Sequence, residues 1–159
     1  MNATIATWRR LWRLNAPSRK LVIEAALVLA ATWVGIRVAG YRRWKSVLES
    51  LTTGSIQRAN SGDSAVLGSA RAIARFQGSA ARHLFLRTNC LEQSLALCCL
   101  LHRRGIGAEL RIGARKEDNK FEAHAWVELG GEVLSPVSDP HRHFEPFDRP
   151  LTSLETETL

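Results

Sequence analysis

Residues 87–116 read RTNCLEQSLALCCLLHRRGIGAELRIGARK, and residues 121–133 read FEAHAWVELGGEV. The first segment predicts a helix that begins at Cys90, because Asn89 can accept a hydrogen bond from the free N–H groups of the first turn. Glu92 can reach back to complete a capping box. Apolar residues then recur at helical spacing until the basic HRRG run, where a glycine ends the helix. The segment therefore places a cysteine at the start of a helix.

That position suits a nucleophile. A thiolate of Cys90 would face unsatisfied N–H groups and the positive end of the helix dipole, which can lower a thiol pKa from ~8.5 toward neutrality. The same N–H groups can hold an oxyanion during acyl transfer. Cys98 and Cys99 lie in mid-helix among leucines, so we interpret them as inert, buried residues. The alternative for Cys90, a small hydrophobe without chemistry, stays open at this point.

The second half predicts antiparallel strands. Residues 108–115 alternate between apolar and polar side chains, as a half-buried strand does. Along residues 121–128 one face carries Phe121, Ala123, Ala125 and Val127, and the other carries Glu122, His124, Trp126 and Glu128. Gly130-Gly131 is a hairpin signal, so residues 132–134 are predicted to pair back. His124 thus points away from the most apolar side, as a base or as a structural histidine.

The runs CLEQSLALCCLLHRRGIGAELRIGARK and FEAHAWVELGGEVL resemble the transglutaminase-like cysteine proteases of lasso-peptide biosynthesis, in their stand-alone form. The resemblance covers residues 87–147 in detail. It implies an α+β fold with a papain-like or transglutaminase-like core, in which the catalytic helix packs on a small antiparallel sheet. A helical amino-terminal half would precede that core.

The resemblance also implies a function, the removal of a leader from a ribosomally made precursor peptide. It implies a separate leader-binding recognition protein and a lasso cyclase as partners, with no cofactor and no metal. Cys90 takes the place of the nucleophile and His124 that of the base. The family's aspartate falls where this chain has Ser135-Pro136, so Asp139 is the favoured third member. Glu128 and Glu132 are the alternatives.

Length and composition fit one domain. The chain has 159 residues, of which 45% are hydrophobic, enough for a single core. We expect one domain over 1–159, with a basic helical arm at 1–51 and a catalytic core at 62–159. Three cysteines, two of them adjacent, do not suggest a disulfide framework, and the start lacks the features of a secretory signal. A cytoplasmic location is therefore expected.

Basic charge gathers in the arm. Residues 1–45 hold nine Lys or Arg and a single acid, Glu24, within a chain of net charge +7. Such an arm can meet acidic peptide, a partner protein or anionic lipid. Trp8 and Trp12, among arginines, suit either a peripheral contact with a membrane or packing on a partner protein. Nucleic acid is not expected as a partner, because no recognised binding fold accompanies the basic residues.

Three helices are predicted before the catalytic one. Residues 21–40 are apolar, but the uncharged run between Glu24 and Arg37 has 12 residues, short of the ~20 that span a bilayer, so a buried helix is expected. An amphipathic helix over 41–51 would direct Trp44, Val47, Leu48 and Leu51 inward. A third would run from Ser61 or Asp63 to about His83, and its spacing places on one side Val66, Ala70, Ile73 and Gln77, with Leu67 and Ala74 beside them. Residues 52–62 are expected to form a loop, and the tail after Pro136 to be irregular.

Other functions stay open. An acyl-enzyme can be resolved by an amine instead of water, which would make the protein a transglutaminase-like acyltransferase. A non-enzymatic scaffold of a peptide-modification complex is a further alternative. His141 and His143 lack the paired spacing of a zinc site.

Overall fold

The computed structural model describes residues 15–52, 64–84, 86–117, 120–134 and 144–147. The helices come first, up to residue 102, and the strands follow, so the α+β class predicted above is observed. The helices are α2 (Ala16–Ala39), α3 (Tyr41–Thr52), α4 (Ser64–His83) and α5 (Cys90–His102). The strands are β1 (Glu109–Glu117), β2 (Lys120–Leu129), β3 (Glu132–Val133) and β4 (Glu145–Pro146), in the antiparallel order β3-β2-β1-β4.

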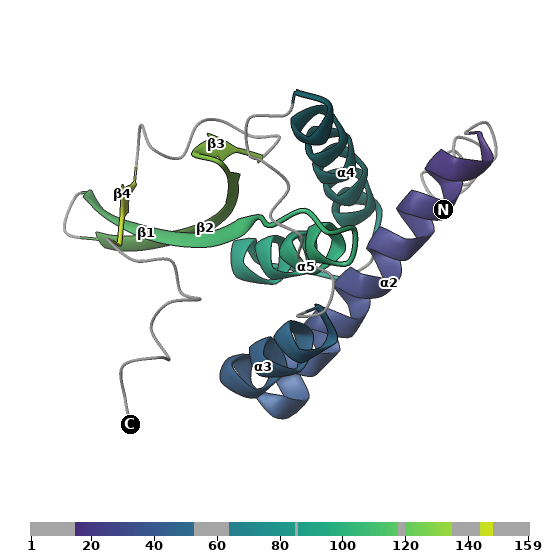
Figure 1. Ribbon diagram of the computed structural model, residues 1–159. Coiled ribbons are helices and arrows are strands. Elements are labelled where there is room, and N and C mark those ends of the chain that lie inside the picture. The colour runs from purple at the N-terminus through teal and green to yellow at the C-terminus, as the bar shows by residue number, and fades with distance from the viewer. Residues whose placement is uncertain (1–14, 53–63, 85, 118–119, 135–143, 148–159) are drawn as a thin grey trace.

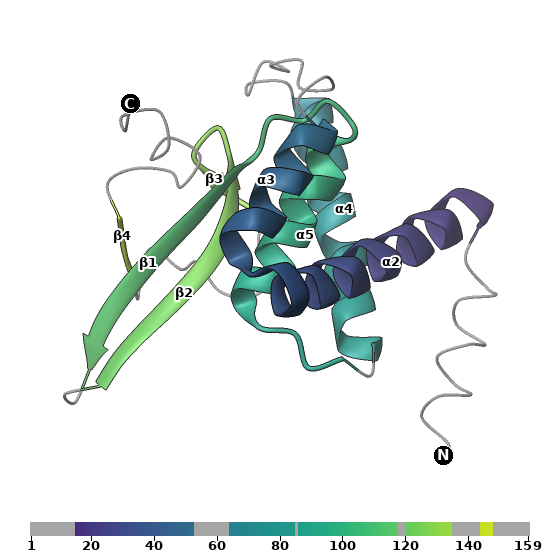
Figure 2. The same cartoon turned by 90° about the horizontal axis from the view of Figure 1, so that it is seen from below.

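Helix α5 lies at the centre of the molecule. Figures 1 and 2 show it between the sheet and the other helices, and it contacts each of α2, α3, α4, β1 and β2. Its sequence explains this position, because a helix that is apolar on every side has to be covered on every side. The buried part is continuous: Ser94, Leu95, Ala96, Leu97, Cys98, Cys99, Leu100 and Leu101.

Helix α2 begins before its apolar run, close to the start that Pro17-Ser18 favours. Asn15 Oδ1 accepts from Ser18 N at 3.2 Å, and Pro17 occupies the first turn of a helix that begins at Ala16. It ends at Gly40, whose φ of 78° suits glycine. Among the described residues α2 is the one helix long and apolar enough to cross a membrane, and 22% of its most apolar window is buried. The expected burial therefore holds for one side of the helix.

Helix α3 packs on α2 through Trp44, and Leu48, one turn later, is buried in the core. The prediction that Val47 points inward is wrong, because Val47 is exposed and Lys45 is buried instead. The predicted inward direction of Leu51 concerns a side chain that the structure does not describe. The two helices lie close together at Gly35, where a Cβ atom would overlap the Trp44 ring. This contact fixes which side of α3 faces the core.

Helix α4 buries the side predicted from its spacing: Ala70, Ile73, Ala74 and Gln77. Gln77 Nε2 donates to Gln93 O at 3.2 Å, which ties α4 to the second turn of α5. The predicted capping residues, Ser61 and Asp63, lie outside the described residues. So do residues 53–62 of the predicted loop, whereas Thr52 belongs to α3.

The hairpin β1–β2 is only partly covered. Ile112 pairs with Ala125 and Gly113 with His124. Phe121 and Ala123, predicted on the inner face, are exposed, because the far end of the hairpin extends beyond the helices (Figure 2). Trp126 and Glu128, predicted on the polar face, are buried. Near its end, β2 is therefore covered on both faces.

The turn and the tail complete the sheet. Gly130 and Gly131 have φ angles of 59° and 83°, as the hairpin signal predicts. The prediction of an irregular tail is wrong at Glu145–Pro146, which pairs with the free edge of β1 at Gly113 and Ala114. An edge strand tolerates proline because one of its sides needs no ladder hydrogen bond.

The contact at Gly35 gives a test of the packing. Gly35→Ala should lower the free energy of unfolding by about 1–3 kcal/mol, because the added methyl group must displace the Trp44 ring. Gly68→Ala, on α4, is the matched control, since nothing lies within 4 Å of its Cβ position. That change should stabilise the chain by about 0.5–1 kcal/mol. Urea unfolding measures both, and equal stabilities of the two variants would contradict the packing.

Candidate active site

Cys90 occupies the first position of α5, and the predicted capping box surrounds it. Asn89 Oδ1 accepts from Glu92 N at 2.8 Å, and Glu92 Oε2 accepts from Asn89 N at 2.9 Å. The thiol is partly exposed. The amides of Cys90 and Leu91 have no acceptor within the helix, because the turn that would supply one precedes its start. Backbone donors and a thiol thus meet at one helix end.

The other two cysteines differ in their surroundings. Burial raises the pKa of the Cys98 thiol, and the neighbouring Cys99 and Glu109 act in the same direction. Burial also raises the pKa of Cys99, although the Arg103 guanidinium opposes it. Both thiols are enclosed by the core. Their positions fit inert residues, which leaves Cys90 as the accessible thiol of α5.

Ser94 connects the start of α5 to the middle of β2. Its Oγ donates to Ala125 O at 3.0 Å, and this hydrogen bond is buried. Cys90 and Ser94 are four residues apart, so they share one side of the helix. Ala125 directly follows His124. The bond therefore places α5, one turn after Cys90, alongside the His124 segment of the strand. Sequence reasoning passed over Ser94, a lone hydroxyl in an apolar helix one turn after the cysteine.

His124 lies within an aromatic group on the outer face of the sheet. Its ring stacks on Phe144 with centroids 5.1 Å apart and on Trp126 at 6.4 Å. Loss of hydration in this half-buried place lowers the pKa of the imidazole, which favours the neutral form. Ala125 and Val127, on the opposite face, belong to the core that includes α5. His124 thus points away from the apolar side, as its place in the alternation predicts.

The structure brings Cys90 and His124 to adjoining segments but does not join their side chains. Within the described residues, no hydrogen bond links Cys90 Sγ to the imidazole. A catalytic pair would need the imidazole to turn around the edge of β2, or the end of α5 to move toward it. Hydrogen bonds between catalytic groups are often long before substrate binds.

The candidate acids have separate partners. Asp139 lies outside the described residues. Glu128 Oε1 accepts from Trp126 Nε1 at 2.6 Å, and its Oε2 forms an ion pair with Arg111 at 3.3 Å. Glu132 Oε2 bonds Arg71 of α4 at 2.7 Å. Glu128 therefore supports His124 through the indole that stacks on it, whereas Glu132 is directed toward α4.

An ion pair between the buried Glu92 and the half-exposed Arg37 of α2 supports the capping box. The Glu92 side chain is 2% exposed, and its Oε1 accepts from Arg37 of α2 at 2.6 Å. The Arg37 guanidinium also donates to Trp33 O at 3.1 Å and covers the Trp33 ring at 4.0 Å. Sequence reasoning treated Arg37 only as an interruption of an apolar run. The partner, Glu92, lies 55 residues further along the chain, so the residues around Arg37 did not indicate it.

Metal ligands do not gather in this region. Across the described ranges, no group of three or more His, Cys, Asp or Glu side chains could hold an ion. His141 and His143 lie outside those ranges.

Comparison with known proteins gives two matches. A family model described as the transglutaminase-like superfamily matches residues 28–148. The microcin J25-processing protein McjB of Escherichia coli is 43% identical over 49 residues, which are 31% of this chain and 23% of that protein. The aligned part is thus less than a quarter of that relative's length. No solved structure matches. Because the family model spans most of the chain, from α2 to beyond β4, this protein belongs to the transglutaminase-like superfamily.

Proposed function

We propose that this protein is a cysteine peptidase that removes the leader from a ribosomally made lasso-peptide precursor. The observation that carries the proposal is the placement of Cys90 at a capped helix start, one turn before the Ser94 bond that holds α5 beside the His124 segment. The similarity to a protein named for microcin J25 processing supports a precursor peptide as the substrate.

The reaction would be acyl transfer through a thioester. His124 removes the thiol proton, and Cys90 Sγ attacks the scissile carbonyl carbon. The oxyanion is stabilised by the amides of Cys90 and Leu91. The imidazolium then protonates the leaving amine, and water, deprotonated by the same imidazole, hydrolyses the thioester and frees the thiol. Asp139 is the proposed group that orients the imidazole.

The pairing of the Glu92 charge in the capping box is part of this mechanism. A carboxylate beside a forming thiolate would oppose its negative charge. In the structure the Glu92 carboxylate is neutralised by Arg37 and bonded to the Asn89 amide. The positive end of the helix is thereby left to act on the sulfur. Arg37 and Glu92 are proposed as positioning residues, since neither is assigned a contact with substrate.

The proposed partners are the precursor peptide, a separate leader-binding protein and a lasso cyclase, in the cytoplasm. A second candidate is amine transfer, which the superfamily match favours because transglutaminases resolve the same acyl-enzyme with an amine. Incubation with precursor and leader-binding protein, followed by mass measurement, separates the two. Hydrolysis gives a leader and a core peptide whose masses add up to the precursor plus water, and amine transfer gives a mass-shifted product.

The first prediction concerns the thiols. Iodoacetamide at neutral pH should label Cys90 in the folded chain, and Cys98 and Cys99 only after unfolding, because burial protects them. Cys90→Ala should abolish precursor cleavage, whereas Cys99→Ala, which removes a thiol from the same helix, should retain it. Peptide mapping and product masses give both readouts. Cleavage by the Cys90→Ala variant would exclude this residue as the nucleophile.

The second prediction concerns pH. Burial lowers the pKa of His124 below its ordinary 6.5, so the neutral base persists below that pH. Cleavage kcat/KM should therefore hold to pH 6.5 and decline only at lower pH. Phe144→Ala exposes the imidazole to water and should move this acid limb toward pH 6.5. His124→Ala should reduce kcat/KM by about 10²–10⁴-fold. An acid limb above pH 6.5 in the unaltered chain would contradict the assignment.

The third prediction concerns the ion pair between Arg37 and the buried Glu92. Arg37→Ala leaves the Glu92 carboxylate buried without its cation and should lower the free energy of unfolding by about 1–3 kcal/mol. The iodoacetamide rate at Cys90 should fall with it, and the added change Glu92→Gln should restore part of both. Arg71→Ala breaks a pair whose two side chains are more than half exposed, so it should cost no more than about 1 kcal/mol and leave the rate unchanged. Equal effects of the two arginine variants would contradict the positioning role.

A further inference from the structure

Helix α2 carries an apolar stripe on the side that faces away from the protein. We define the outer stripe as the exposed residues at helical spacing along α2, all apolar except Lys20: Ala16, Lys20, Ile23, Leu27, Ala31, Val34 and Val38. Leu27 is 66% exposed and Val38 is 81% exposed. At 100° per residue these positions lie within one narrow sector of the helix. A continuous apolar surface of this kind indicates a contact site.

The other side of α2 is occupied by the protein core. Ala25, Val28, Leu29, Thr32 and Gly35 are buried against the remaining helices. The fold therefore needs one side of this helix and leaves the other to a partner. A partner that surrounded α2 completely, as a bilayer surrounds a spanning helix, would have to strip it from α3, α4 and α5. The structure favours a partner that meets one side only.

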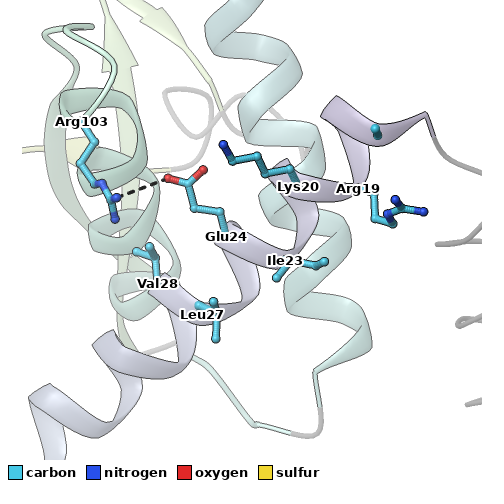
Figure 3. A pocket seen from close by; sticks show the side chains of 8 residues that line it. Arg19, Lys20, Ile23, Glu24, Leu27, Val28 and Arg103 are labelled. Atoms are coloured by element: carbon cyan, nitrogen blue, oxygen red, sulfur yellow. Dashed lines mark ion pairs between the residues drawn. The ribbon is translucent and has the colours of Figure 1, made fainter.

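Positive charge lies at both ends of the outer stripe. Lys20 belongs to the stripe, Arg19 adjoins it, and Arg42 and Arg43 are exposed at the start of α3, just past its other end. The nearby acid Glu24 is neutralised, because it pairs with Arg104 at 2.6 Å and with Arg103 at 3.8 Å. Figure 3 shows the Glu24 side chain directed toward Arg103. The two residues line a pocket of about 640 Å³ together with Lys20, Ile23 and Leu27.

We propose that the outer stripe lies on the surface of a bilayer that contains anionic lipid, with the helix parallel to the membrane plane. Isoleucine, leucine and valine side chains would enter the boundary of the acyl chains, and the basic residues would meet lipid phosphates. A second copy of this chain is a poor occupant, because paired stripes would bring the basic ends of two helices together in either orientation. This proposal does not depend on the peptidase function.

Vesicle co-sedimentation of the full chain tests the proposal. Binding should be strong to vesicles of phosphatidylcholine mixed with phosphatidylglycerol, weaker to phosphatidylcholine alone, and reduced by salt. The double variant Leu27→Gln/Val38→Gln should bind at least about tenfold more weakly, because two exposed apolar groups are lost. Lys20→Gln should weaken binding to the anionic vesicles by about fivefold and leave binding to neutral vesicles unchanged.

Phe121→Gln is the matched control, since Phe121 is 76% exposed on the far end of the hairpin and should not contribute. All the altered side chains are exposed, so thermal unfolding should be unchanged. Four results would overturn the proposal: no vesicle binding, equal binding by the double variant, resistance of the bound chain to alkaline extraction, or a lipid-free dimer that the double variant abolishes. The third would indicate a spanning helix and the fourth a second copy.

Discussion

The active-site region depends on the hydrogen bonds and the ion pair that the buried Glu92 carboxylate forms. Glu92 is 2% exposed in the first turn of α5, where a charge without partners would be costly. It is compensated from two directions, by the Asn89 amide within the same turn and by Arg37 from α2. The carboxylate therefore has two roles, because it caps the start of α5 and joins that helix to α2. Cys90 takes its position from this arrangement.

The parts of the fold set by local sequence could be predicted. The cap at Asn89, the glycine turn at Gly130-Gly131 and the alternation that turns His124 away from the apolar side each follow from neighbouring residues. Such features depend on hydrogen bonds and backbone angles within a few positions. The helical spacing of α4 predicted its buried side for the same reason.

The parts that depend on distant residues could not be predicted. Nothing near Arg37 in the chain indicates a partner 55 residues away, and nothing near Ser94 indicates the Ala125 carbonyl. The burial of Trp126 reflects cover on the second face of the sheet, which alternation alone cannot show. Val47 was misplaced because the close approach at Gly35 selects the Trp44 side of α3. Asp139, the residue that would complete the proposed triad, lies outside the described residues.

Helix α2 has three sides with different contacts, and because it is a single helix their relative positions are fixed. Its inner side supplies core residues such as Leu29, its flank supplies Arg37 to the start of α5, and its outer side is the apolar stripe. Val38 of the stripe directly follows Arg37. A surface that binds the stripe would therefore hold the helix start that carries Cys90 at a fixed height and tilt above it, because a single packed helix connects the two. A precursor peptide would then have to approach from the sides that the surface leaves open, which makes the orientation of α2 a constraint on substrate entry.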